Sequence, residues 1–131
     1  MDEIQYQLKI ADFCSYAGIA QWEEVARTQH IEVQGKTIGL IPDHGGRLSV
    51  YIDLGPVYRE RDPRIFEQML IANMEARGPL SGAFCIYPDS GNAVYHMPLH
   101  AEVTGQELAG HIASALEHIG ARFDELSGAT T

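Results

Sequence analysis

Residues 48–54 read LSVYIDL and carry the clearest β-strand signal in the sequence. Every second side chain is apolar, so these side chains project from one face of an extended strand. Two earlier segments, 31–33 and 38–40, continue the same alternation with Ile31, Val33, Ile38 and Leu40. The short turn Gln34-Gly35 and the looser turn at 42–46 separate the three segments. This pattern predicts an antiparallel three-stranded meander.

Amphipathic segments predict three helices around this meander. The first spans residues 2–17 and ends at Gly18, a residue typical of helix ends. Asp62-Pro63 supplies a cap and a first-turn proline for the second helix, and Gly78-Pro79 ends it. The third helix begins with the capping box TGQE at 104–107 and runs to about Leu126.

Two further strands are expected at 82–87 and 93–97. The segment PDSGN between them has the composition of a hairpin turn. The predicted order is helix, three strands, helix, two strands, helix (α-β-β-β-α-β-β-α). The class is therefore α+β, with a twisted antiparallel sheet packed by helices. A length of 131 residues fits one domain. We expect that domain to span residues 1–126, followed by a frayed tail at 127–131.

The first helix carries two apolar stripes instead of one. Ile4, Leu8 and Ala11 line one face at helical spacing. A second face, about 150° away, contains Tyr6, Ile10, Phe13 and Ala17. Either the helix is buried between two layers of its own domain, or one stripe faces the core and the other faces a partner. On the second interpretation we expect the Ile4–Leu8 stripe to face the core.

Composition excludes several classes of partner. Net charge is −9 and only 9 residues are Lys or Arg, which is too few for a phosphate-binding surface. The first ten residues, MDEIQYQLKI, lack the basic start and apolar block of a signal peptide. We therefore expect a cytoplasmic bacterial protein that binds neither nucleic acid nor membrane. In that compartment the two cysteines are reduced thiols, and a disulfide between them is the less favoured alternative.

No catalytic or metal-binding pattern is apparent. The six histidines have no ligand spacing typical of a metal site: His30, His44, His96, His100, His111 and His118. Cys85 lies in the middle of a predicted strand, where a small buried thiol is its ordinary role. We predict that the protein is not an enzyme and needs no cofactor, metal or nucleotide.

The second half of the chain resembles a known family. The residues that carry the resemblance are LIANMEARG (70–78), GAFCIYPDSGNAVYHMPLH (82–100) and TGQELAGHIASALEHI (104–119). These segments are similar to class I type III secretion chaperones, the group that includes the Tir chaperone-like proteins. The first half agrees with that family in element order, small size and acidity.

The resemblance implies a homodimeric chaperone. Its partner would be the N-terminal segment of a secreted effector, kept soluble and partly unfolded for export without ATP, and secretion-apparatus components are possible further partners. The family's subunit contact, carried over to this sequence, falls on its second helix and fourth strand. It comprises Ile65, Met69, Met74, Phe84 and Ile86, some of which we expect to be ordinary core residues.

The client segment is expected along the first helix and the strands near it. On the partner interpretation of the second stripe, Tyr6, Ile10 and Phe13 form a pocket wall. The adjoining sheet surface would be formed by Ile31, Val33, Ile38 and Leu40.

Two other functions stay open at this point. The same fold could act as a regulatory or protein-interaction domain with no secretion client. A small α+β enzyme or ligand-binding protein that uses Cys85 or a histidine is a further alternative, which a deep polar pocket would support.

Overall fold

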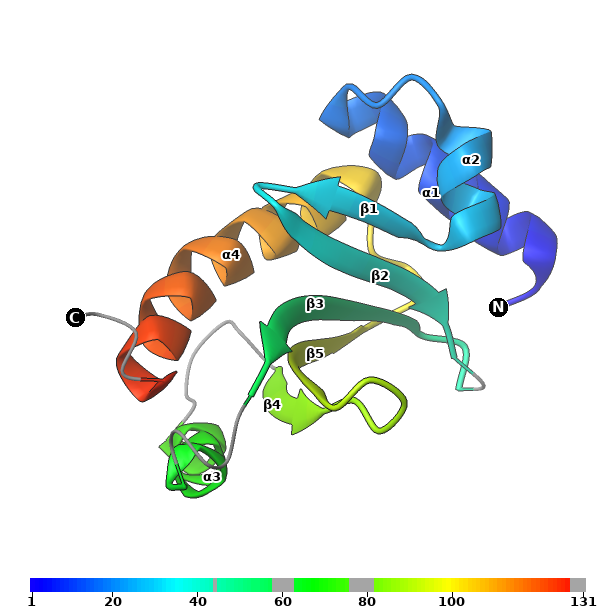
Figure 1. Cartoon of the computed structure of the whole chain (residues 1–131). Helices are drawn as coiled ribbons and strands as arrows, with labels where there is room; N and C mark the ends of the chain where they lie inside the picture. Colours follow the sequence, from blue (N-terminus) through cyan, green and yellow to red (C-terminus); the bar gives the residue numbers. More distant parts are fainter. Residues whose placement is uncertain (44, 58–62, 76–81, 128–131) are drawn as a thin grey trace.

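The computed structural model describes residues 1–43, 45–57, 63–75 and 82–127 (Figure 1). The elements follow one another as α1 (Glu3–Ala17), α2 (Trp22–Thr28), β1 (His30–Val33), β2 (Lys36–Pro42), β3 (Leu48–Pro56), α3 (Ile65–Glu75), β4 (Ala83–Ile86), β5 (Asn92–Leu99) and α4 (Gly105–Ser127). This succession confirms the α+β class and the predicted order, with one additional helix. None of the helices, within the residues that are described, is long and apolar enough to cross a membrane.

The five strands form one antiparallel sheet in the order β1-β2-β3-β5-β4. β3 lies at its centre, where Ile52 pairs with Ile38 of β2 and with Tyr95 of β5. The predicted turn between β1 and β2 is present, and both Gln34 and Gly35 have positive φ angles, 54° and 77°. Two successive left-handed residues match the right-handed twist of a two-residue hairpin. The strand alternation therefore predicted the meander correctly, and the Gln34-Gly35 pair predicted its first turn.

The core lies on one face of this sheet. Leu48, Val50 and Ile52 of β3 are all fully buried there, as their spacing predicts. The long helix α4 contributes the other side of the core through Leu108, Ile112, Ala115 and Ile119. α1 packs beside α4 (Figure 1). Helical spacing on α4 and period-two spacing on β3 thus supply the two sides of the same cluster.

Hydrogen bonds from its own first turn and from α1 stabilise the start of α4. Thr104 and Glu107 form the expected capping box, in which the Glu107 N–H donates to Thr104 Oγ1 at 3.1 Å and the Thr104 N–H donates to Glu107 Oε1 at 3.1 Å. Asp12 of α1 accepts the Gly105 N–H at 2.7 Å through its Oδ2 atom. Because the first N–H groups of a helix have no partner within it, these carboxylates stabilise the end of α4 against α1.

The helix α2 was not expected. The sequence pattern predicts three helices, and residues Trp22–Thr28 form a fourth. It has only seven residues, and no side chain caps its N-terminus at Gln21. Val25 is its one buried residue among those described. So short a helix has neither a full apolar stripe nor a capping signal, and its packing against α1 stabilises it instead.

α3 lies beside the edge strand β4. It begins at Ile65, shortly after the predicted Asp62-Pro63 start, but Asp62 and the Gly78-Pro79 stop lie outside the described residues. The side-chain amide of Asn73 bonds to the backbone of Phe84 in both directions. The Phe84 N–H donates to Asn73 Oδ1 at 2.7 Å, and Asn73 Nδ2 donates to the Phe84 carbonyl at 3.0 Å. The amide therefore occupies backbone positions that a further strand would use.

Candidate functional site

The two stripes of α1 are arranged opposite to the prediction. Ile4 and Leu8 are 69% and 66% exposed, whereas Tyr6, Ile10 and Phe13 are buried at 4%, 0% and 3%. Periodicity locates the stripes but does not say which one faces inward. The stripe with two aromatic rings removes more apolar area from water. The Tyr6 hydroxyl also finds a buried partner, since it donates to the Leu40 carbonyl. The interpretation in which Tyr6, Ile10 and Phe13 face a partner is therefore wrong.

The sheet residues predicted to contact the client also face the core. Ile31, Ile38 and Leu40 are buried at 7%, 0% and 0%, and Val33 is half-buried. Their alternation directs them to the face that α1 and α4 cover, so they belong to the hydrophobic core or pack against it. The apolar surface available on α1 is instead its outer stripe at Ile4 and Leu8.

A small cavity of about 470 Å³ borders this outer stripe at Leu8. Its walls come from α1 and from the loop that precedes α4: Met1, Gln5, Leu8, Lys9, Asp12, Ala101 and Glu102. The exposed stripe of α1 and this cavity together present an apolar surface with polar groups around it.

The strand β1 is an open edge of the sheet. The Leu40 N–H of β2 donates to the Gln29 carbonyl at 2.8 Å, which fixes the side of β1 that faces β2. In an antiparallel pair the backbone groups alternate, so those of His30 and Glu32 face away from β2. The His30 carbonyl already accepts from Thr28 Oγ1 at 3.4 Å, so the open groups are chiefly those of Glu32. The opposite edge differs, because Asn73 occupies the backbone of Phe84. An added strand would therefore find its open backbone groups on β1.

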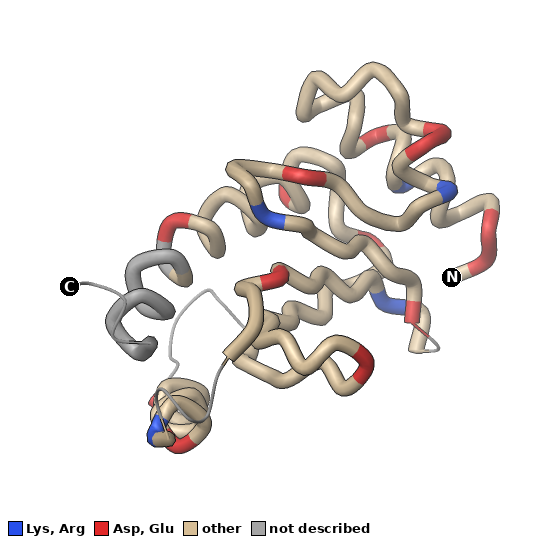
Figure 2. Tube along the Cα trace, viewed as in Figure 1, with Lys and Arg blue, Asp and Glu red and all other residues tan. Residues whose placement is uncertain are grey.

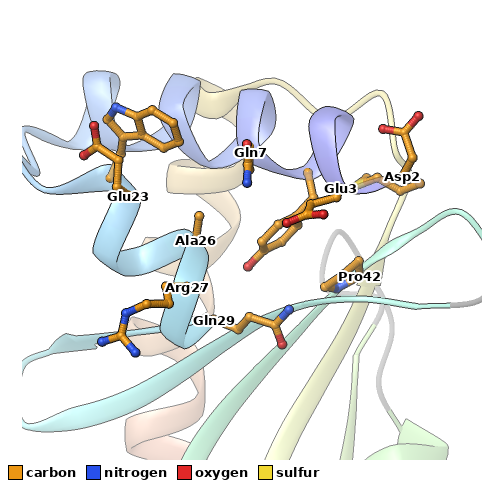
Figure 3. A pocket seen from close by; sticks show the side chains of 11 residues that line it. Asp2, Glu3, Gln7, Glu23, Ala26, Arg27, Gln29 and Pro42 are labelled. Carbon is orange, nitrogen blue, oxygen red and sulfur yellow. The ribbon is translucent and has the colours of Figure 1, made fainter.

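A larger cleft of about 670 Å³ lies between α1, α2 and the sheet (Figure 3). Its lining residues are Met1, Asp2, Glu3, Tyr6, Gln7, Trp22, Glu23, Ala26, Arg27, Gln29 and Pro42. Acidic residues stand at the start of both helices, as Figure 2 shows along the Cα trace. Burial, with a smaller effect from Cys14, raises the pKa of Tyr6 to about 12. The phenol therefore stays protonated and keeps donating to Leu40.

An apolar surface also covers α3 and β4. Leu70 and Met74 are 70% and 82% exposed on α3, and Ile71, Ile86 and Tyr87 are also exposed. We call these five residues the α3–β4 patch. Of the predicted dimer residues, Met74 and Ile86 lie in this patch. Ile65, Met69 and Phe84 are core residues beneath it, buried at 2%, 4% and 8%.

The groups considered for catalysis have ordinary structural surroundings. Burial raises the pKa of the Cys85 thiol, which is the opposite of what activates a nucleophile. Cys85 Sγ donates to the Ala83 carbonyl, and Cys14 and Cys85 are both free thiols. Within the described part of the chain, no three His, Cys, Asp or Glu residues are grouped to hold a metal ion.

Known proteins resemble this chain in both sequence pattern and fold. The pattern of the Tir chaperone protein (CesT) family matches residues 10–120. Among solved structures, the Yersinia pestis type III secretion chaperone SycH, in complex with a stable fragment of YscM2, has a similar fold. The TM-score is 0.60 at 13% sequence identity, over 86% of this chain and 95% of that one. No curated protein sequence matches. Because the family pattern covers most of the sequence, the chain belongs to the Tir chaperone protein (CesT) family.

Proposed function

We propose that this protein is a bacterial cytoplasmic chaperone that binds the N-terminal segment of a type III secretion effector. It keeps that segment soluble and partly unfolded for export, without ATP and without catalysing a reaction. The observation that carries the proposal is the outer stripe of α1. Ile4 and Leu8 are 69% and 66% exposed, and the hydrophobic core is formed by the other side of the helix.

Exposed apolar residues at this spacing are suited to an unfolded client. A single exposed apolar side chain needs no explanation. Ile4 and Leu8, however, lie on adjacent turns beside a cavity and form a surface that another apolar segment can cover. The open edge of β1 adds a second mode of contact, because an extended segment can pair with the backbone at Glu32. Both modes bind a chain that has not folded. Family membership agrees with this function, and the fold neighbour was solved with a protein fragment bound.

Client capture tests the proposal. The affinity-tagged chain is expressed in its native host, purified under mild conditions, and its bound proteins are identified by mass spectrometry. We expect one or a few secreted proteins, each bound through its first segment, and binding that neither added ATP nor chelator changes. Recovery of only non-secreted proteins would favour a regulatory domain of the same fold and would reject the proposal.

Three variants then locate the client. The double variant Ile4→Asp/Leu8→Asp should lose the client and keep its melting temperature, since exposed changes usually cost less than about 0.5 kcal/mol. The control Ala113→Asp/Ser114→Asp places the same two charges on exposed positions of α4 and should keep the client. Ile10→Asp should unfold the chain, because Ile10 is fully buried and an unpaired charge there costs several kcal/mol. A folded Ile4→Asp/Leu8→Asp variant that still binds the client would exclude this stripe as the site.

A further inference from the structure

The free edge of β4 carries backbone groups that point away from the sheet. The Tyr87 N–H donates to the Asn92 carbonyl of β5 at 2.9 Å, so the backbone of Tyr87 faces β5. Because residues alternate along an antiparallel pair, the backbone groups of Phe84 and Ile86 face the other way. Asn73 of α3 bonds to both groups of Phe84, whereas Ile86 is 38% exposed at the end of the strand. One side chain therefore closes the middle of this edge.

The Asn73 carboxamide reproduces the hydrogen bonds of a neighbouring strand. In an antiparallel ladder, a residue opposite Phe84 would accept its N–H and donate to its carbonyl. Asn73 does the same through Oδ1 at 2.7 Å and Nδ2 at 3.0 Å, because a carboxamide holds an acceptor and a donor side by side. α3 lies beside β4, so this side chain stands where a further strand would run (Figure 1).

The surface around this edge favours a second copy of the chain as the strand that would otherwise add. The α3–β4 patch surrounds the edge with exposed apolar side chains, among them Met74 at 82% and Ile86 at 38%. An open edge within an apolar surface is the arrangement through which copies of a protein join sheet to sheet. β4 is also self-complementary. If two copies pair antiparallel about Cys85, Phe84 of each lies opposite Ile86 of the other, and all of their outward groups are paired.

We infer that Asn73 closes the β4 edge against a second copy of this chain. Two copies that meet at the α3–β4 patch then touch through side chains, and their sheets do not join. Ile65 and Met69 hold α3 in the core, and Asn73 pins its last turn to β4. When the amide is removed, that turn can move away from β4 and the Phe84 backbone becomes available. This device is independent of the client, because the β1 edge lies at the other end of the sheet.

Cys85 reports whether two β4 edges have joined. In the pairing about Cys85, the two copies of this residue form a non-hydrogen-bonded pair with Cα atoms about 4.5 Å apart. That separation is within the range of a disulfide. The chain is incubated with oxidised glutathione at high concentration, and the disulfide-linked dimer is measured by non-reducing electrophoresis. We expect Asn73→Ala to form this dimer about tenfold faster than the parent chain, because two hydrogen bonds that close the edge are lost.

Two further variants separate closure of the edge from a general loosening of the fold. Ile86→Pro removes the outward N–H that a second copy needs and leaves the bonds between β4 and β5 in place. Combined with Asn73→Ala, it should return the rate of cross-linking to that of the parent chain. Gln68→Ala removes a half-buried carboxamide elsewhere on α3 and should cross-link like the parent chain.

The position of the cross-link shows whether the folded chain has reacted. Cys14 is only 1% exposed and should stay free. If Asn73→Ala also links through Cys14, it has unfolded and Asn73→Asp replaces it. That variant keeps the acceptor for the Phe84 N–H, loses the donor, and should cross-link at an intermediate rate.

Equal rates in the Asn73 variant and the parent chain would overturn the inference, as would cross-linking that Ile86→Pro does not slow. In dilute solution two copies rarely meet, so the open edge then appears as faster hydrogen exchange at Phe84.

Discussion

Gly105 lies where the first turn of α4 meets α1. A Cβ atom at this position would be 2.7 Å from the carbonyl carbon and oxygen of Asp12 and from the Phe13 nitrogen. Backbone atoms cannot move aside as the end of a flexible side chain can. We expect Gly105→Ala to lower the free energy of unfolding by about 1–3 kcal/mol through overpacking, measured by urea denaturation.

Gly110 provides the matched control on the same helix. A Cβ there meets nothing within 4 Å, so Gly110→Ala should raise stability by about 1 kcal/mol through helix propensity alone. If both alanine variants are stabilised, α1 and α4 do not approach each other as closely as the structure indicates.

His96 makes stability depend on pH near neutrality. Its ring stacks on Tyr51 at a centroid distance of 4.4 Å, and its Nε2 atom lies 3.1 Å from Ser49 Oγ. Burial lowers the pKa of His96 below its ordinary 6.5, although the nearby Asp43 carboxylate opposes the shift. The unfolded chain then binds this proton more readily than the folded chain. Stability is therefore full above the unfolded pKa and falls as pH drops below about 6.5, until the folded pKa is passed.

Thermal melts at about pH 7.5, 6.5 and 5.5 check this dependence. His96→Gln should flatten the dependence over that range. Hydrogen bonds lower the pKa of Asp43, chiefly the one from the Arg47 backbone, so its own stabilising effect is lost only at more acidic pH. A parent and a His96→Gln chain with parallel pH curves would show that His96 is not the responsible group.

Among the elements, the edge strand β4 depends on one side chain of α3. Asn73→Ala removes both bonds to Phe84 and leaves its N–H and carbonyl without that partner. We expect a loss of about 1–3 kcal/mol in the free energy of unfolding, and faster hydrogen exchange at Phe84. Ser114→Ala, at an exposed position of α4, should stay within about 0.5 kcal/mol of the parent chain. Slow exchange at Phe84 in the Asn73→Ala variant would contradict the role of the amide.

The elements that sequence predicted correctly have strong local signals. The alternation at 48–54 requires an extended strand with one covered face, and Leu48, Val50 and Ile52 are fully buried there. Gly18 ends α1 in the left-handed conformation that favours glycine. The capping box at Thr104 forms as its sequence indicates. In each case the residues that determine the local structure lie within a few positions of it.

The missed features depend on residues that are far apart in the chain. Which stripe of α1 faces inward depends on the acceptor that Leu40 offers to Tyr6, 34 positions away. The cleft needs α2, whose seven residues give too weak a periodic signal to predict a helix. No local sequence motif joins the residues that line it, which include Tyr6, Trp22 and Gln29. The one available signal was the tryptophan, a residue enriched at interfaces.

At the scale of the whole molecule, the large exposed apolar residues among those described fall into two separate groups, with Tyr16 of α1 outside both. One is the outer stripe of α1, and the other is the α3–β4 patch at the opposite edge of the sheet from β1. A client and a second subunit can therefore occupy different surfaces. The α3–β4 patch is the better candidate for a permanent contact, because buried Ile65, Met69 and Phe84 anchor it to the core.

We predict that two chains associate through the α3–β4 patch. The parent chain should have twice its 14.5 kDa mass in size-exclusion chromatography with light scattering at micromolar concentration. Met74→Glu/Ile86→Glu should run as a monomer, because these residues are 82% and 38% exposed in the single chain and their charges would meet across a two-fold contact. Ile4→Glu/Leu8→Glu, at positions 69% and 66% exposed on α1, adds the same two charges outside the patch and should remain dimeric. A monomeric parent chain would reject the dimer. A Met74→Glu/Ile86→Glu variant that stays dimeric would show that the two subunits meet elsewhere.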